Sequence, residues 1–167
     1  MHLTDGRTAR RLTTITPVNV DVLERVELFR PLPRADLARL AERGALRRFA
    51  PGTALMRQGE TGETMHVIVA GLVRVDRWLP DERIVKLAEL GAGEIVGEMG
   101  LLDRAPRSAT VTAIEPTETL ELHATALAVV LIENPDVSSA LLRTLSRRLR
   151  SADELVVEMS RAQKGRI

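Results

Sequence analysis

The middle of the chain, from Leu46 to Leu122, consists of short β-type runs separated by glycines. Four of these runs alternate apolar and polar residues with a period near two: 65–75, 83–90, 108–115 and 118–123. Several short strands at this spacing predict an all-β sandwich or barrel. Aromatic residues make up only 2% of the sequence. We therefore expect a core of leucine, valine, isoleucine and alanine.

Helical patterns flank this β-rich middle on both sides. Residues 18–29 have apolar residues at helical spacing, and 33–43 form a second short helix with Pro33 in its first turn. After the strands, the pattern predicts a helix over 125–133 and a long, proline-free helix over 136–163. The pattern predicts a mainly β protein, with small helices, a β-barrel and then a long terminal helix. It divides the chain into a flexible arm (1–17), a domain with the barrel (18–134) and a C-terminal helix (135–167); the family resemblance described below implies that this barrel is a jelly-roll-like β-roll.

Composition argues against several classes of function. The net charge is +1, from 24 basic and 23 acidic residues, so no large single-sign field attracts nucleic acid or a membrane surface. No apolar run approaches the roughly 18–20 residues that span a bilayer. The absence of cysteine excludes disulfides and thiolate metal sites and fits a reducing cytoplasm.

Enzyme and metal chemistry have no support in the pattern. The three histidines, His2, His66 and His123, lie in no metal-binding spacing, and no nucleophile–base pair is recognisable. We expect a non-enzymatic protein without a metal site.

The most informative motif is GEMGLLDRAPRSATV, residues 97–111. Gly97 and Gly100 let the backbone turn and approach a ligand, and a helical turn at Met99–Leu102 would present free N–H groups to an anion. Pro106 fixes the chain direction before Arg107, whose guanidinium can bind a phosphate through two parallel hydrogen bonds. The Glu98 carboxylate would repel an anion but can accept hydrogen bonds from a neutral hydroxyl next to it. Glu98 and Arg107 together therefore suit a sugar phosphate. The alternative interpretation is a surface turn with an exposed Glu–Arg ion pair.

This motif resembles the phosphate-binding cassette of the cyclic nucleotide-binding domain family, a β-roll found in bacterial catabolite activators, kinase regulatory subunits and gated channels. The spaced glycines of residues 51–75 resemble the family pattern upstream of it. The resemblance implies that Glu98 binds the ribose 2′-hydroxyl and Arg107 the cyclic phosphate. It also implies that Ser108 and backbone amides around Gly97, Met99, Gly100 and Ala109 complete the cradle. Val96 and Gly100 depart from the residues most common in the family.

The resemblance also indicates where a base would bind. Leu87 and Ala88 are expected walls for a purine, and the C-terminal helix is the expected lid. By alignment, Ala152 and Asp153 reach the base, where Asp153 would accept from an adenine amine; a solvated helix residue is the alternative. We expect cAMP as ligand, with cGMP possible, because Ser108 does not decide between them.

The last helix has an apolar stripe at spacings of three and four residues, typical of a coiled-coil seam. We expect it to form a homodimer; packing against the chain's own barrel is the alternative. Arg143, Arg147, Arg148 and Arg150 are interpreted as a solvated face rather than a DNA-reading surface. The stripe consists of Leu142, Leu145, Leu149, Ala152, Val156 and Met159.

The sequence and its resemblance therefore predict a cytoplasmic, bacterial-type cyclic nucleotide sensor that signals through its hinge helices to an unknown protein target. Two alternatives stay open. One is an interaction module of the same fold with an unused cassette, and the other is the cytoplasmic sensor domain of a larger channel, enzyme or transcription factor.

Overall fold

The structure is a computed structural model that describes residues 20–164. The predicted arm at 1–17 lies outside the described residues. The elements are, in order, α1 (Val20–Arg25), the 3₁₀ turn η1 (Glu27–Phe29), α2 (Arg34–Glu42), β1 (Ala45–Phe49), β2 (Ala54–Met56), β3 (Thr64–Ala70), β4 (Leu72–Trp78), β5 (Ile84–Gly91), β6 (Ile95–Val96), α3 (Glu98–Asp103), β7 (Thr110–Ala113), β8 (Thr117–His123), α4 (Ala124–Glu133) and α5 (Pro135–Lys164).

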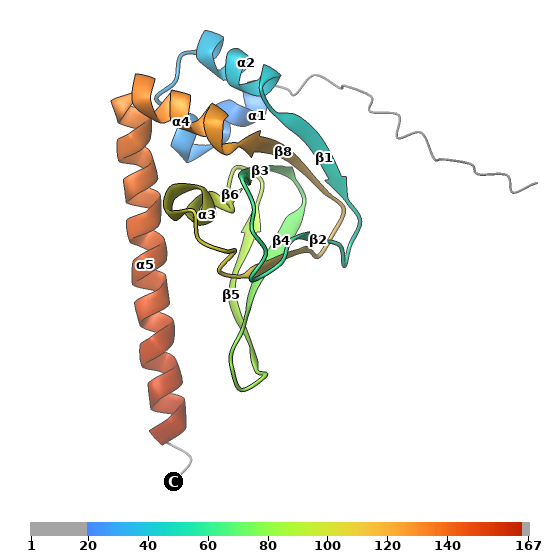
Figure 1. Cartoon of the computed structure of the whole chain (residues 1–167), viewed down its shortest axis with the longest axis vertical. Coiled ribbons are helices and arrows are strands. Elements are labelled where there is room, and N and C mark those ends of the chain that lie inside the picture. Colours follow the sequence, from blue (N-terminus) through green and yellow to red (C-terminus); the bar gives the residue numbers. More distant parts are fainter. Residues whose placement is uncertain (1–19, 165–167) are drawn as a thin grey trace, which may run out of the picture.

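The strands form two four-stranded antiparallel sheets. One has the order β1-β8-β3-β6 and the other β2-β7-β4-β5. Consecutive strands thus lie in different sheets, except for β4 and β5, which pair with each other as a hairpin. The helices gather at one end of the roll, and α5 runs down its side past α3 and the β4–β5 hairpin (Figure 1). The predicted fold class is confirmed.

The core is aliphatic, as the composition predicts. Its larger part lies between the helices and the sheet that contains β3 and β8, where Leu23, Phe29, Leu120 and Leu122 are fully buried. A smaller cluster between the two sheets lies behind the cassette and contains Met56, Ile68, Val73, Val96 and Val111.

The N-terminal helix is shorter than predicted, because the single helix expected over 18–29 breaks at Val26. Val26 has an extended conformation (φ −72°, ψ 117°), and the chain continues as η1. In an unbroken helix Leu28 would point away from the face shared by Leu23 and Val26. The break lets Leu28 and Phe29 both enter the core, where they are 2% and 0% exposed.

The long helix α5 has one half packed on the domain and one half free of its core. Val137, Ala140 and Leu141 are buried, and Leu145 packs partly against the same core. Leu145 is therefore shared between the predicted seam and the chain's own domain. The rest of the apolar stripe is exposed: Leu142, Leu149 and Val156 keep 66%, 65% and 62% of their surface, and Met159 keeps 38%.

Within residues 20–164, no single helix is long and apolar enough to cross a membrane. Only α4 and α5 taken together pass a test of length and composition, and they are bent by 116° where they meet.

Candidate functional site: a phosphate-binding cassette and its cavity

The motif at residues 97–111 forms a turn, a short helix and a return strand. Strand β6 ends at Val96, which pairs with His66 of β3. Gly97 follows with a left-handed φ of 84°, a conformation that glycine adopts without steric cost. Helix α3 then begins at Glu98, so the predicted helical turn is present. The chain returns through Pro106 and Arg107 to β7.

Arg107 is buried, with 7% of its surface exposed. Its Nη1 donates to the Gly97 carbonyl at 2.9 Å and its Nη2 to the Thr64 carbonyl at 2.6 Å. Burial lowers the pKa of Arg107, while the nearby charges of Glu60 and Glu98 oppose that effect. A guanidinium has five N–H donors, so donors remain for a bound anion. The side chain is therefore fixed in place and desolvated.

The backbone of Arg107 is held as firmly as its side chain. Its N–H donates to the Glu60 carbonyl at 2.8 Å, and its own carbonyl accepts from the Gly59 N–H at 2.8 Å. The loop between β2 and β3 thus pairs with the cassette like a short extra strand. No short-range pattern in the sequence indicates this contact of the loop with Arg107.

Three glycines leave the space that the guanidinium occupies. A Cβ on Gly62 would lie 2.4 Å from Nη2 of Arg107, and one on Gly97 would lie 3.0 Å from Nη1. A Cβ on Gly100 would meet the Ala105 carbonyl at 3.3 Å and Nη1 at 3.4 Å. Close contact with the Arg107 guanidinium is therefore one reason for glycine at each of these positions, beside the left-handed φ of Gly97.

Glu98 is 1% exposed and is held by an arginine from the last helix. Arg148 of α5 donates to the Glu98 carboxylate and, at 2.5 Å, to the Ile95 carbonyl. Its neighbour Arg147 forms a two-bond ion pair with Glu27, at 3.1 and 2.7 Å, and this contact lowers the pKa of Glu27. Arg147 is exposed, as the interpretation of a solvated face expects, whereas Arg148 is partly buried against Glu98, and neither ion pair was predicted. Each has a partner far away in sequence, which helix periodicity alone does not reveal.

A cavity of about 910 Å³ lies between the cassette, the β4–β5 hairpin and α5. All of the predicted site residues except Asp153 line it: Leu87, Ala88, Gly97, Glu98, Met99, Gly100, Arg107, Ser108 and Ala109. Asp153 is exposed and lies outside the lining; from this part of α5 the cavity is lined by Leu149, Ser151, Ala152 and Leu155. The alternative for Asp153, a solvated helix residue, matches its place in this structure.

Leu87 and Ala88 are consecutive in β5, yet both line this cavity. In a regular strand, consecutive side chains point to opposite faces. The register shifts between Val75 and Asp76, so that Val75 pairs with Ala88, Asp76 pairs with Lys86, and Leu87 is left out of the pairing. This bulge provides the irregularity that lets both residues face the cavity.

His66 lies in β3, next to the cassette, and is 2% exposed. Its Nδ1 lies 2.9 Å from the Thr119 hydroxyl, and its ring packs edge-on against Phe49 with centroids 5.8 Å apart. Burial lowers the pKa of His66 to about 4. His66 is thus a neutral structural histidine, and within the described residues no group of three or more potential metal ligands occurs.

Similarity to known proteins identifies the family of this chain. The profile of the cyclic nucleotide-binding domain matches residues 46–134. The chain belongs to the cyclic nucleotide-binding domain family. The predicted resemblance is thereby confirmed at the level of the family.

Several relatives are regulators or channels. The chain is 27% identical over 139 residues to a CRP-like cAMP-activated global transcriptional regulator of Mycobacterium tuberculosis, covering 83% of this chain and 62% of that protein. It is 37% identical over 107 residues to a cyclic AMP receptor protein of Thermus thermophilus, covering 64% of this chain and 50% of the relative. It is 33% identical to a cyclic nucleotide-gated potassium channel of Rhizobium etli, of which it covers 35%. The chain thus spans less than two thirds of each.

Solved structures share the fold. The catabolite activator protein of Thermus thermophilus superposes with a TM-score of 0.72 at 33% identity, over 80% of this chain and 63% of that one. The N-terminal domain of a Streptomyces coelicolor transcriptional regulator superposes with a TM-score of 0.64 at 36% identity, over 81% and 94% of the two chains.

Proposed function

We propose that this protein is a non-enzymatic sensor that binds a cyclic nucleotide, with cAMP as the first candidate. The observation that carries the proposal is the buried guanidinium of Arg107, which the Thr64 and Gly97 carbonyls fix beside the buried carboxylate of Glu98. A desolvated, oriented cation suits a cyclic phosphate, and a carboxylate next to it suits the ribose hydroxyl. Two relatives whose names include cAMP or cyclic AMP support the choice of cAMP.

In this proposal Arg107 pairs with the exocyclic phosphate oxygens and Glu98 accepts from the 2′-hydroxyl. Ser108 and the amides near Gly97, Gly100 and Ala109 complete the cradle. Met99, Leu87 and Ala88 contribute the apolar walls against which the base and sugar pack. All of these residues line one cavity, which supports their acting on one ligand.

We propose that the signal leaves the site through α5. Arg148 donates a hydrogen bond to the Glu98 carboxylate. A ribose hydroxyl that competes for this carboxylate therefore weakens the contact between the cassette and α5. The same helix carries the exposed stripe, which we propose as a homodimer seam. A ligand shifts this equilibrium only by its differential affinity for the two helix positions. Because Arg147 and Arg148 are engaged within the domain, direct DNA binding by this face of α5 is not proposed.

The two alternatives make different predictions. A module with an unused cassette binds no cyclic nucleotide, whereas a sensor domain of a larger channel, enzyme or transcription factor binds one and passes the signal to another domain. A cytoplasmic location is part of the proposal and rests on the cysteine-free sequence.

Calorimetry with cAMP and cGMP tests the proposal directly. The wild type is expected to bind, and Arg107→Ala to lose roughly 2–5 kcal/mol, because an enclosed phosphate loses its charged partner. Arg39→Ala, which removes an exposed arginine of α2 far from the cavity in sequence, is the matched control. If the wild type shows no binding heat and no gain in melting temperature with millimolar cAMP, the proposal is wrong. The interaction module with an unused cassette would then be favoured.

A further inference from the structure

The cavity is lined by four arginines, and one of them is not engaged by the protein. Arg107 is held by backbone carbonyls, and Arg147 and Arg148 are paired with Glu27 and Glu98. In the part of the chain that the structure describes, the Arg77 side chain makes no hydrogen bond or ion pair. Its guanidinium therefore has its donors available to whatever enters the cavity.

Strand geometry points Arg77 at the wall that the base is expected to contact. Residues at alternate positions of β4 share a face, and Arg77 follows Val75, which lines the same cavity. Across the hairpin Arg77 pairs with Val85 and Val75 pairs with Ala88. Arg77 thus continues the wall formed by Val75 and Ala88, on the side toward the hairpin tip.

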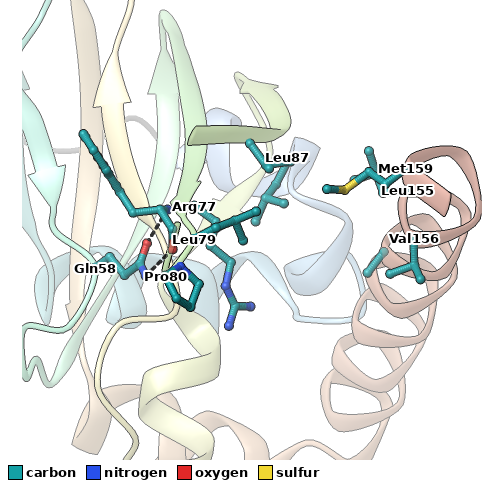
Figure 2. Close-up of a pocket in the computed structure, with 11 residues that line it drawn as sticks. Gln58, Arg77, Leu79, Pro80, Leu87, Leu155, Val156 and Met159 are labelled. Atoms are coloured by element: carbon teal, nitrogen blue, oxygen red, sulfur yellow. Dashed lines mark hydrogen bonds between the residues drawn. The ribbon is translucent and has the colours of Figure 1, made fainter. Parts of the chain in front are cut away.

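Arg77 also lies where this cavity adjoins a second one. The second cavity, of about 630 Å³, separates the hairpin from the C-terminal half of α5, and Arg77, Leu87, Ala152 and Leu155 line both. Figure 2 shows the Arg77 side chain extending from β4 into the space between the hairpin and α5. Gln58 holds the hairpin below it by two hydrogen bonds with the backbone of Trp78, at 2.8 and 3.1 Å. The long side chain thus projects from an anchored strand.

A guanidinium only donates hydrogen bonds, so it distinguishes bases by their acceptors. Guanine presents two adjacent acceptors, O6 and N7, which an arginine binds with two hydrogen bonds. Adenine presents N7 beside an amino group, which is itself a donor. An unpaired guanidinium on the base wall therefore favours a purine with a 6-oxo group.

We propose that Arg77 is a specificity residue that contacts the base edge and raises the affinity for 6-oxo purine cyclic nucleotides relative to cAMP. This inference rests on the proposed function, since it assumes that a cyclic nucleotide occupies the cavity. It concerns only the ratio of the two affinities and leaves the phosphate contact of Arg107 unchanged.

The test is calorimetric titration of wild type and Arg77→Leu with cAMP, cGMP and cyclic inosine monophosphate. The inosine nucleotide has O6 and N7 but lacks the 2-amino group of guanine. We expect Arg77→Leu to weaken binding of cGMP and of the inosine nucleotide about tenfold more than binding of cAMP, a typical loss for one base contact of this kind. Arg83→Leu is the matched control, because Arg83 lies on the same hairpin, pairs with Asp81 and is outside both cavity linings.

The outcomes separate the inference from the proposed function. Equal losses for all three nucleotides in Arg77→Leu, or equal effects of Arg77→Leu and Arg83→Leu, would overturn the inference and leave the sensor intact. A wild type that binds none of the three would overturn both. Unchanged melting temperatures of the variants without ligand would show that the affinity differences come from the contact rather than from folding.

Discussion

Arg148 of α5 donates to both the carboxylate of Glu98 in α3 and the carbonyl of Ile95 at the end of β6. One side chain from the last helix thus holds both ends of the cassette's first turn. Glu98 is 1% exposed, whereas the side chain of Arg148 is 32% exposed. The contact therefore pairs the buried charge of Glu98 with an arginine that water can reach. Removing Arg148 is expected to destabilise the fold more than removing the charge of Glu98.

The first prediction follows from this asymmetry. Arg148→Leu leaves the buried carboxylate unpaired and is expected to cost about 3 kcal/mol of unfolding free energy. Glu98→Gln, which leaves a partly exposed arginine with access to water, is expected to cost less. The double variant should recover part of the loss, with a coupling of roughly 0.5–3 kcal/mol. Urea denaturation measures all three, and Arg150→Leu, an exposed arginine two residues further along, is the control.

The second prediction concerns the space around Arg107. In Gly62→Ala the new methyl group overlaps the guanidinium, 2.4 Å from Nη2, so the side chain must leave its contacts with Thr64 and Gly97. We expect cAMP affinity to fall at least about tenfold, since small displacements of a binding group are costly in a packed site. Gly91→Ala is the control, because its new Cβ would meet its nearest atoms at 3.8 Å. Equal affinities of the two variants would contradict this role for Gly62.

The third prediction is the pH dependence of stability that His66 imposes. Its pKa is lowered from 6.5 to about 4 by burial, so the unfolded chain takes up the proton at a higher pH than the folded one. Stability is therefore lost as the pH falls from about 6.5 toward 4, by at most about 3 kcal/mol from this residue. His66→Gln should flatten the slope in this window. Urea midpoints between pH 4 and 7 measure it, and an unchanged slope would show that other groups cause it.

Local patterns predicted the elements of this fold well, because alternation and glycine spacing reflect which side of each strand is buried. The β-rich middle, the turn at Gly97 and the long last helix follow from such short-range signals, whereas the β-roll itself was implied by the family resemblance. The break at Val26 was missed because it depends on whether Leu28 can reach a core that distant strands and the C-terminal helices complete.

The site was predicted from one motif, and its partners from elsewhere in the chain were not. Arg148 lies 50 residues after Glu98 and Thr64 lies 43 residues before Arg107, separations over which a single sequence has no pattern to read. Asp153 was placed by alignment of the helix, but the direction in which a helix residue points depends on how the helix packs. In this structure Ser151 and Ala152 line the cavity instead.

The fourth prediction tests the exposed stripe on α5. Leu142, Leu149 and Val156 follow one another at intervals of seven residues, which places them along one side of the helix, and each keeps more than half of its surface exposed. An apolar seam with this repeat is stabilised by a matching helix, and a second copy about a two-fold axis supplies one. Leu149→Glu places a charge at the centre of this seam and is expected to convert a dimer to a monomer by light scattering after gel filtration. Arg150→Glu, an exposed change at the next position, should leave the dimer intact. A wild type that is monomeric at high micromolar concentration would contradict the seam, and cAMP titrations at the same concentrations would then show whether the nucleotide site works in a single copy.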